Sequence, residues 1–413
     1  MVTQYPATWA DVRLGDLATI VRGASPRPID NFLTDSPSGT NWIKIGDAPR
    51  KGRYISSTAE RVTKEGAEKS VHVVPGDLIL SNSMSFGRPY ILRISGCIHD
   101  GWLRLSDFDK RVDVRFLAEL LASSFVYQQY ESLAAGSGVQ NLNKEVVRKV
   151  AIPLPSLPEQ QAIADVLSGF DEHLANLDAL IAKKQAIRDG ALEELVSGTR
   201  RIPGFSQPWR VINFAEEIIP KARIGWQGLK AGEYLRSGYS LLISGTDFED
   251  GHVSTKQIFF VSQKRYEMDP AIQVQAGDVL VTKDGTIGKV ALVPDLGMPA
   301  TLNSGVFVFR PHSSLAREFL YWVLMSSVFR AFINTLAAGS TIKHLYQKDL
   351  ADFSFSAPST DSEQISISEA LFAMDAEIVS LVEERAKVER LKQGAMEDLL
   401  TGRVRLPVHE EAS

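Results

Sequence analysis

Cysteine is nearly absent from this sequence of 413 residues, because Cys97 is the only one. An internal disulfide is therefore excluded, and the composition fits a reducing compartment. One thiol cannot supply the ligands of a thiolate metal site, and the seven histidines stand singly along the chain. The sequence thus predicts no metal site.

Long apolar runs are missing as well. No uninterrupted stretch approaches the ~20 residues that a membrane-spanning helix needs. The opening residues, MVTQYPATW, contain no basic segment followed by an apolar one, so we expect no secretory signal. We therefore expect a soluble, cytoplasmic protein that has no membrane partner.

The sequence also lacks the motifs of several common catalytic sites. It has no Asn/Asp-Pro-Pro-aromatic segment, which amino-methylating enzymes use, and no Gly-x-x-x-x-Gly-Lys-Ser/Thr phosphate loop. The nearest match to that loop, Gly285 to Lys289, has the wrong spacing and is expected to form a hairpin turn. No Asp or Glu stands two positions before a lysine, which removes half of a common nuclease site. We predict that the chain is not an enzyme by itself and holds no cofactor of its own.

The formal net charge is only −5, but it is unevenly distributed. Residues 1–155 carry 19 Lys and Arg against 16 Asp and Glu, and residues 205–357 carry 15 against 14. Residues 156–204 carry 5 against 8, and residues 358–413 carry 6 against 12. A polyanion would therefore bind to residues 1–155 and 205–357 and not to the two acidic segments.

One helix-forming stretch occurs twice, at 156–197 and at 360–401, and a constant shift of 204 residues aligns the copies without a gap. Each copy begins with the spacing of a capping box and ends at a glycine followed by a proline. The sequence thus predicts two long helices that arose by internal duplication. The aligned positions are Ser156 with Thr360, Glu159 with Glu363, Gln160 with Gln364, Asp171 with Asp375, Gly190 with Gly394, Gly198 with Gly402 and Pro203 with Pro407.

Apolar residues recur in steps of four and three along both copies, which is the pattern of a coiled-coil seam. At ~1.5 Å per residue each helix would be about 60 Å long, more than one small domain covers. The alternative is that each helix packs only along the edge of its own domain. The predicted seam consists of Ile163, Leu167, Phe170, Leu174, Leu177, Ile181 and Leu195 in the first copy and Ile367, Leu371, Met374, Ile378, Leu381, Val388 and Leu399 in the second.

Four basic residues interrupt this seam: Lys184, Arg188, Arg385 and Lys392. Long basic side chains can cover apolar surface with their methylene groups while the charge stays in water. We therefore expect the stems of these four residues to lie along the seam and their charges to reach water.

The regions before the two helices are weaker copies of each other. Each opens on a tryptophan shortly after a proline, and each contains a Gly-Asp turn that leads into an apolar strand. Short strands mixed with a few helices predict the α+β class for both. We divide the chain into a first domain (1–155), a first spacer helix (156–204), a second domain (205–357), a second spacer helix (358–407) and a disordered tail (408–413).

Two copies of one domain-plus-helix unit can pack with their helices antiparallel, which relates the copies by an approximate two-fold axis. The two domains would then lie at opposite ends of the helices. Duplex DNA has local two-fold axes of its own, and paired readers address half-sites that lie roughly 34 Å or more apart. The sequence therefore predicts two similar, diverged modules that a rigid spacer holds apart.

Over nearly its whole length, the chain resembles the specificity (S) subunits of Type I restriction–modification enzymes. The resemblance depends on the order of its pieces, together with the two long helices. Those pieces are Trp9, Trp209, Gly76-Asp77, Gly277-Asp278, Asp284 to Lys289, Ala135 to Leu142, Pro153 to Pro155, and Glu159-Gln160.

This resemblance implies two target-recognition domains that read a split double-stranded DNA sequence, with the helices as spacer. It further implies that two modification (methyltransferase) subunits dock on the chain and supply the S-adenosylmethionine site for adenine methylation. Restriction subunits would add translocation and cleavage, for which they use ATP and Mg.

Within such domains we expect base contacts from polar loops, through hydrogen bonds of Arg, Lys, Asn, Ser and Thr side chains to groove edges. The alternative for each candidate is an ordinary solvated surface residue. The candidates are Lys44, Arg50, Arg53, Ser83, Ser85, Arg88 and Asn141 in the first domain, and Thr246, Lys256, Lys283, Thr286, Lys289, Lys343 and His344 in the second.

Three other functions stay open on the sequence alone. The chain could be a helical scaffold that joins protein partners without DNA. It could be a fused enzyme with its own methylating or cleaving site, against which the missing motifs argue. It could also be an anti-restriction or phage-defence relative with the same architecture.

Overall fold

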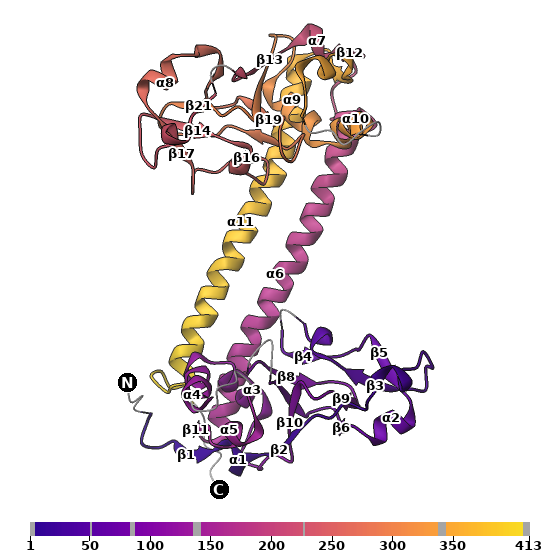
Figure 1. The fold of residues 1–413 in the computed structure, drawn as a ribbon, viewed down its shortest axis with the longest axis vertical. Coiled ribbons are helices and arrows are strands. Elements are labelled where there is room, and N and C mark those ends of the chain that lie inside the picture. Colours follow the sequence, from indigo (N-terminus) through magenta and orange to yellow (C-terminus); the bar gives the residue numbers. More distant parts are fainter. Residues whose placement is uncertain are drawn as a thin grey trace. The chain divides into compact units, whose positions relative to one another are not determined.

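The structure is a computed structural model that describes residues 5–49, 52–82, 87–134, 142–225, 228–337 and 344–407 (Figure 1). The predicted tail, 408–413, lies outside these residues. The chain divides into two compact units: unit 1 comprises residues 1–179 and 383–413, and unit 2 comprises residues 180–382. Each unit therefore contains one globular domain and a part of each long helix.

Two sheets form the globular part of unit 1, one in the order β2-β10-β7-β8-β4 and one in the order β5-β3-β9-β6, and β1 pairs with β11. The strands are β1 (Ala10–Arg13), β2 (Thr19–Arg22), β3 (Thr40–Ile43), β4 (Tyr54–Ile55), β5 (Glu60–Val62), β6 (Val71–Val73), β7 (Leu78–Ser81), β8 (Pro89–Leu92), β9 (Gly96–Ile98), β10 (Trp102–Ser106) and β11 (Ala151–Leu154). The helices are α1 (Leu14–Leu17), η1 (Ile29–Asn31), η2 (Ile45–Asp47), α2 (Lys64–Glu68), α3 (Val114–Leu121), α4 (Ser124–Ala134) and α5 (Lys144–Arg148).

Unit 2 contains sheets in the orders β13-β22-β19-β20-β16-β15 and β17-β14-β21-β18, and β12 pairs with β23. The strands are β12 (Trp209–Asn213), β13 (Ile218–Ala222), β14 (Ser240–Ile243), β15 (Phe248–Glu249), β16 (His252–Val253), β17 (Phe259–Val261), β18 (Gln273–Val274), β19 (Val279–Thr282), β20 (Val290–Leu292), β21 (Ala300–Leu302), β22 (Val306–Pro311) and β23 (Ser354–Pro358). The helices are α7 (Phe214–Glu217), η4 (Ala231–Glu233), η5 (Gly245–Asp247), α8 (Gln263–Glu267), η6 (Pro270–Ile272), α9 (Arg317–Met325), α10 (Ser327–Ala337) and η7 (Gln347–Asp352).

The strand orders of the two units correspond one to one. The order β2-β10-β7-β8-β4 matches β13-β22-β19-β20-β16, and β5-β3-β9-β6 matches β17-β14-β21-β18. The predicted α+β class and the internal duplication are therefore confirmed. The turn expected from Gly285 to Lys289 is also confirmed, because it joins the antiparallel strands β19 and β20.

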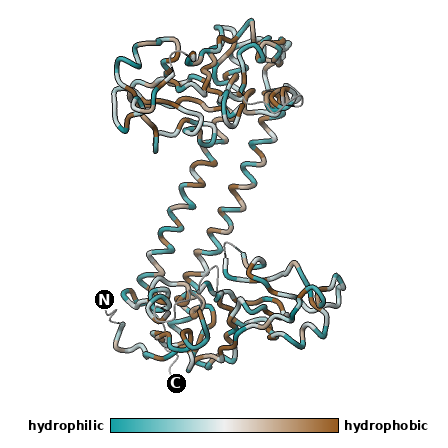
Figure 2. The backbone as a smooth tube through the Cα atoms, in the orientation of Figure 1, coloured by the Kyte–Doolittle hydropathy of each residue, from teal (hydrophilic) through white to brown (hydrophobic). Residues whose placement is uncertain are grey.

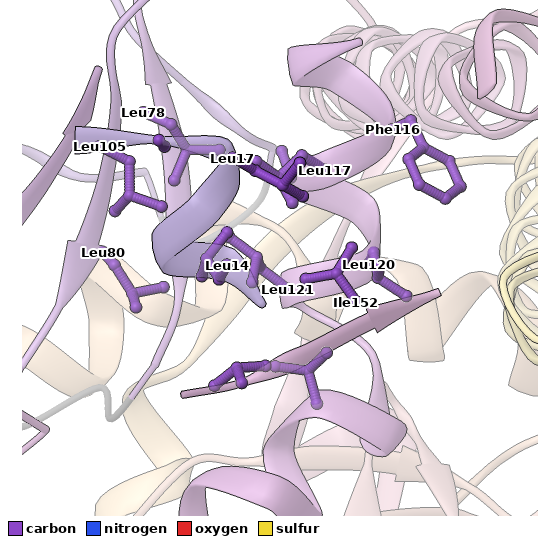
Figure 3. Close-up of a cluster of buried hydrophobic side chains, with 14 of the residues drawn as sticks. Leu14, Leu17, Leu78, Leu80, Leu105, Phe116, Leu117, Leu120, Leu121 and Ile152 are labelled. Atoms are coloured by element: carbon purple, nitrogen blue, oxygen red, sulfur yellow. The ribbon is translucent and has the colours of Figure 1, made fainter. Parts of the chain in front are cut away.

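Strand β7 separates two hydrophobic clusters in unit 1. Leu78 and Leu80 face the cluster of Figure 3, which contains Leu14 and Leu17 of α1 and the apolar face of α3. Ile79, between them, belongs to a second cluster with Trp102. Successive side chains of a strand point to opposite faces. A strand that is buried on both faces, such as β7, therefore needs consecutive apolar residues and not an alternation of apolar and polar ones.

The two long helices are α6 (Leu157–Ser197) and α11 (Asp361–Leu399). Both are followed by glycines in the predicted left-handed conformation, Gly198 with φ +74° and Gly402 with φ +69°. The expected capping box at the start of α11 is wrong: the buried Thr360 hydroxyl has no hydrogen-bond partner. The Glu363 carboxylate binds Trp209 and Arg201 instead of the helix start.

Within each unit the parts of α6 and α11 run antiparallel, because partner numbers rise on one helix as they fall on the other. In unit 1, Arg385 Nε lies 2.6 Å from Asp178 Oδ1, and Lys392 pairs with Asp171. In unit 2, Lys184 Nζ lies 2.6 Å from Glu377 Oε1, and Arg188 Nη1 lies 3.1 Å from Asp375 Oδ1. The four basic seam residues thus meet carboxylates of the other helix, whereas we expected their charges to reach water.

Every predicted seam residue is at least partly buried. Ten are buried, and Phe170, Leu174, Met374 and Leu381 are half-buried. Figure 2 shows hydrophobic and hydrophilic residues interspersed along both helices. No single described helix is both long and apolar enough to cross a membrane, and one bent pair, Arg317–Met325 with Ser327–Leu336, passes that test only when taken together.

A buried Glu-Gln pair begins each long helix. In unit 1, Trp9 Nε1 donates to Glu159 Oε2 over 3.2 Å, and Arg405, just beyond the end of α11, donates to the same oxygen over 2.7 Å. In unit 2, Trp209 and Arg201, just beyond the end of α6, bind Glu363 in the same way. This arrangement ties the first strand of each domain to both long helices.

The glutamine of the pair joins the helix to the domain. Gln160 Oε1 accepts the N–H of Asp113 at the start of α3 (2.9 Å), and Gln160 Nε2 donates to the carbonyls of Arg111 (2.8 Å) and Pro155 (2.9 Å). Gln364 makes the equivalent bonds to Ala316, Ser314 and Pro358 in unit 2.

Replacing Gln160 by methionine should lower the free energy of unfolding of unit 1. The change removes three hydrogen bonds, of which the one to the Pro155 carbonyl is buried and the other two are partly buried. A typical bond contributes about 0.5–1.5 kcal/mol and a buried group left unsatisfied costs about 1–3 kcal/mol, so we expect a total loss of about 2–6 kcal/mol. Chemical denaturation measures it. The matched control is Gln161→Met, since Gln161 is exposed on the same helix; equal losses for both variants would contradict this account.

Candidate nucleic-acid interface

Four segments of unit 2 meet at one place through backbone hydrogen bonds. The N–H of Lys283 donates to the carbonyl of Gly305 (2.9 Å), and the N–H of Leu345 donates to the carbonyl of Lys283 (2.8 Å). The N–H of Asn303 donates to the carbonyl of Ile243 (2.8 Å). Residues 244–247, 283–289, 303–305 and 344–346 are here called the loop cluster of unit 2.

Unit 1 repeats the same backbone bonds. The N–H of Asn82 donates to the carbonyl of Gly101 (3.0 Å), and the N–H of Leu142 donates to the carbonyl of Asn82 (3.0 Å). The N–H of His99 donates to the carbonyl of Ile43 over 3.4 Å. Residues 44–47, 82, 87–88, 99–101 and 142–143 are the described part of the loop cluster of unit 1.

The Gly-Asp turns hold the strands beneath both loop clusters. Asp278 is fully buried; it accepts hydrogen bonds from Arg310 Nη2 (2.8 Å) and from the Gln275 N–H (3.1 Å). Asp77 accepts from Arg104 Nε (2.8 Å) and from the Val74 N–H (2.9 Å) in the same manner. The aspartate therefore fixes the turn before β7 or β19 and ties it to β10 or β22.

The side chains on these shared backbones differ between the units. Lys44 occupies the position of Ser244, and in both units the backbone N–H there donates to an aspartate three residues on (2.7 Å). By the same backbone bonds, Asn82 corresponds to Lys283, and His99 corresponds to Asn303. The two loop clusters thus present different hydrogen-bonding groups on one framework.

The structure brings most of the candidates of the second domain together. Thr246, Lys283, Thr286, Lys289 and His344 all lie in the loop cluster of unit 2. Thr246, Thr286 and Lys289 are exposed, Lys283 Nζ lies 5.5 Å from the centre of the Phe307 ring, and His344 pairs with Asp284. Lys256 lies apart on the segment after β16, where its Nζ pairs with Glu249 (3.1 Å). Lys343 lies outside the described residues.

The candidates of the first domain are more dispersed. Lys44 lies in the loop cluster of unit 1 and pairs with Glu60, and the half-buried Arg88 lies 5.3 Å from the centre of the Tyr90 ring. Arg53 is committed to the interior of unit 1, because it pairs with Glu119 and its Nη1 donates to the Ala118 carbonyl (3.2 Å). We therefore withdraw Arg53 from the proposed base readers. Arg50, Ser83, Ser85 and Asn141 lie outside the described residues.

Sequence reasoning missed several residues of the clusters. Asn303 links three segments, because its Nδ2 donates to Ser244 Oγ (3.0 Å) and its Oδ1 accepts from Tyr234 Oη (3.3 Å). Ser304 and Tyr346 are exposed at the same place. An alignment of the two domain sequences could have found them, because it pairs Asn303 with His99 and shows at which equivalent positions both domains carry polar residues.

His99 is held neutral by its surroundings. Burial lowers its pKa, against the opposing effect of Asp100, and Lys44 also lowers it. The Gly101 N–H lies 2.6 Å from Nδ1, and the Ile45 N–H lies 3.3 Å from Nε2. A neutral ring has one acceptor nitrogen and can accept one of these two N–H groups, whereas a protonated ring has none and can accept neither.

No described His, Cys, Asp or Glu side chains form a group of three or more that could hold a metal ion. The loop cluster of unit 2 presents exposed Lys, Thr, Ser and Tyr side chains on hydrogen-bonded loops, whereas Lys44 and Arg88 in the described part of the unit 1 cluster are half-buried.

A comparison with protein families identifies this architecture. The model for the Type I restriction modification DNA specificity domain matches residues 6–184 and 243–390. The chain belongs to this family. It is a specificity subunit of the Type I restriction–modification class, which confirms the family predicted from the sequence.

Known specificity subunits are distant relatives of this chain. The MjaVIII specificity subunit of Methanocaldococcus jannaschii is 24% identical, over 98% of this chain and 94% of that protein. The EcoKI specificity subunit of Escherichia coli is 24% identical over 68% of this chain and 62% of its own length.

Solved structures support the same fold. The HsdS subunit from Thermoanaerobacter tengcongensis is 20% identical, with a TM-score of 0.53 over 97% of this chain and 98% of that one. A chain from work on complex assembly and conformational transition of the type I R-M system is 19% identical, with a TM-score of 0.63 over 97% of this chain and 100% of that one.

The neutral His99 predicts that this specificity subunit loses stability in acid. Because the folded pKa of His99 is lowered, the unfolded chain binds more protons below pH ~6.5, and stability falls as pH decreases through that value. We expect a loss of up to about 1.4 kcal/mol for each pH unit below it, and part of it should vanish in His99→Asn, which installs the residue of unit 2. Thermal unfolding between pH 7.5 and 5.5 measures this, with the exposed His72→Asn as control; an unchanged pH slope in His99→Asn would refute it.

Proposed function

We propose that this specificity subunit reads a bipartite DNA target, with one half read by the loop cluster of each unit. The observation that carries the proposal is the shared backbone of the two clusters, which bears different side chains at equivalent positions. Direct readout depends on which donors and acceptors reach the base edges, so one framework with two sets of side chains suits two different half-sites.

Within each cluster we propose a set of exposed or half-buried polar residues as the base readers. In unit 2 these are Thr246, Lys283, Thr286, Lys289, Ser304 and His344, with Lys343 kept from the sequence. In unit 1 they are Lys44 and Arg88, with Arg50, Ser83, Ser85 and Asn141 kept from the sequence. Lys256, which lies apart from the cluster, is proposed to contact a phosphate.

The spacer and the partners complete the proposal. Two long helices that continue through both units would fix the separation of the half-sites, and therefore the number of unread base pairs between them. The acidic segments 156–204 and 358–413 disfavour a polyanion. From the family resemblance, two modification subunits would dock on the chain and supply S-adenosylmethionine binding and adenine methylation. Restriction subunits with ATP and Mg would join through them. The chain itself would be non-catalytic and cytoplasmic.

Mapping of adenine methylation tests this function. The chain is expressed with its modification subunit in a host that lacks other adenine methylation, and methylated sites are read across the genome. We expect a split motif with a fixed gap. An uninterrupted motif would refute the bipartite readout, and a purified complex that fails to bind duplex DNA in a salt-dependent way would favour the scaffold alternative instead.

Lys289 gives a residue-level prediction, because it is exposed at the end of the β19–β20 loop, where its carbonyl accepts the Thr282 N–H (2.9 Å). Lys289→Ala should relax one position of one half-site and cost about 1–3 kcal/mol there. Competition binding with single-base variants of the target measures this. Lys264→Ala, an exposed position on α8 away from the cluster, should change nothing. If affinity fell equally for all sequences and the salt slope dropped by about one, Lys289 would be a phosphate contact.

A further inference from the structure

Arg223 stands directly after β13 in unit 2, and only 2% of its surface is exposed. Its Nε donates to the Leu302 carbonyl over 3.0 Å, and its Nη2 lies 3.4 Å from Thr301 Oγ1. Both partners belong to β21, which lies in the other sheet of unit 2 (Figure 1). Arg223 therefore links the two sheets at the point where β21 leads into residues 303–305 of the loop cluster.

The charge of Arg223 is not neutralised by a carboxylate. Among the described residues its Nη1 has no hydrogen-bond partner, and the two carboxylates whose charges act on it are bound elsewhere. Glu233 Oε1 lies 2.7 Å from Arg265 Nε, and Asp269 accepts the Ala271 N–H over 3.0 Å. Burial lowers the pKa of the Arg223 guanidinium, but an arginine stays charged in proteins.

Stability does not explain an arginine at this position. A buried charge without a counter-charge carries a penalty that a well-packed apolar side chain avoids. The corresponding residue of unit 1 is Gly23, which directly follows β2, and an added Cβ there would lie 2.1 Å from the His99 carbonyl oxygen. The shared fold thus forms without this side chain, and Arg223 is a feature of unit 2 alone.

In unit 1 the same segment binds the equivalent loop through other side chains. Arg22 Nε donates to the Asp100 carbonyl over 3.2 Å, and Ser25 Oγ donates to Asp100 Oδ1 over 2.8 Å. Asp100 stands 204 residues before Ser304 and lies in the loop cluster of unit 1. In both units, therefore, residues at the end of β2 or β13 hold the loop between the last two strands of the domain's sheets.

The loop that Arg223 holds carries a proposed base reader of unit 2. Ser304 is exposed, and its N–H donates to Asn303 Oδ1 over 2.8 Å. The Asn303 N–H donates in turn to the Ile243 carbonyl over 2.8 Å. Since Asn303 follows Leu302 directly, the place of both polar residues depends on where the end of β21 is fixed.

We propose that Arg223 is a positioning residue for DNA recognition by unit 2. By binding the end of β21 from the other sheet, it fixes where Asn303 and Ser304 meet the base edges. Its unneutralised charge suits a site that receives a polyanion. The inference rests on the proposed function, since it requires that the loop cluster of unit 2 reads DNA.

Hydrogen exchange in the free, full-length chain tests the positioning without DNA. In Arg223→Met the Asn303 N–H should exchange about tenfold faster, because the loop loses its bond to the segment after β13. Residues 99–101 of unit 1 are the internal control and should keep their exchange rates. Unchanged exchange at residues 303–305 would overturn the proposal.

Competition binding tests the consequence in the complex with the modification subunit. Single-base variants are made in each half of the target, and in Arg223→Met we expect discrimination to fall about tenfold in one half and to stay the same in the other. Arg223→Lys keeps the charge and one donor, so it should recover part of the loss. No loss in either half, or an equal loss in both, would contradict a role in positioning the loop of unit 2.

Thermal unfolding separates this role from a purely structural one. Arg223→Met removes an unneutralised charge and should not lower the unfolding midpoint. The matched control is Arg210→Met on β12, because Arg210 is half-buried and its Nη1 lies 2.7 Å from Glu217 Oε1. This control should lower the midpoint and leave discrimination unchanged. If Arg223→Met gave the same result as Arg210→Met, Arg223 would be structural only.

The proposed function is judged separately. A split methylation motif in the unsubstituted chain, together with unchanged discrimination in Arg223→Met, would remove only this inference. The absence of a split motif in the unsubstituted chain would remove the proposed function, and the inference with it.

Discussion

One buried carboxylate at the start of each long helix is the constraint on which each unit depends. Glu159 and Glu363 are almost completely excluded from water. An ionised carboxylate is costly to bury without partners, so a tryptophan N–H and an arginine must reach it. The tryptophan lies at the start of the first strand of the domain (Trp209) or directly before it (Trp9), and the arginine comes from just beyond the end of the other long helix. Satisfying this charge therefore fixes strand, domain and both helices together.

The helix ends obey the same requirement. A Cβ on Gly402 would lie 2.6 Å from Pro6 Cδ, and one on Gly198 would lie 3.2 Å from the Trp209 ring. Both glycines also adopt positive φ, which turns the chain so that Arg405 or Arg201 can reach the glutamate. Each helix ends where it does because the arginine that follows must reach the start of the other one.

Farther along α6 and α11 the contacts between the helices are weaker and more exposed to solvent than those at the helix ends. A hollow of about 380 Å³ in unit 1 is lined by Asp171, Asp178, Arg385 and Lys392, so long charged side chains span the space between the two helices. Partly exposed ion pairs of this kind contribute about 0–1 kcal/mol each. The apolar seam alone could not have predicted these ion pairs. Its spacing indicates which residues face the other helix, but not how closely the two helices approach.

The sequence therefore predicted the fold better than the site. Glu159, Gly198 and the apolar seam recur at a constant shift along the whole helix. This repeat can be recognised in the sequence even if any one of its residues is changed. The loop clusters depend on three-dimensional closure: Asn303 and Ser304 gain their place from backbone bonds to Lys283 and Ile243, which no local spacing encodes. Arg53 misled the sequence reasoning because an arginine in a polar loop looks the same whether it faces water or Glu119.

The junction between domain and helices has also diverged. In unit 1 the buried Glu119, whose pKa burial raises despite Arg53, joins the ionic group of Asp171 and Lys392. Its counterpart in unit 2 is Trp322, which packs 5.1 Å from the Phe372 ring. A domain moved whole from one unit to the other would bury a carboxylate against an aromatic surface, or leave Asp171 and Lys392 facing an indole. The two units thus share the backbone bonds of their reading loops but differ in the side chains that join domain and helices.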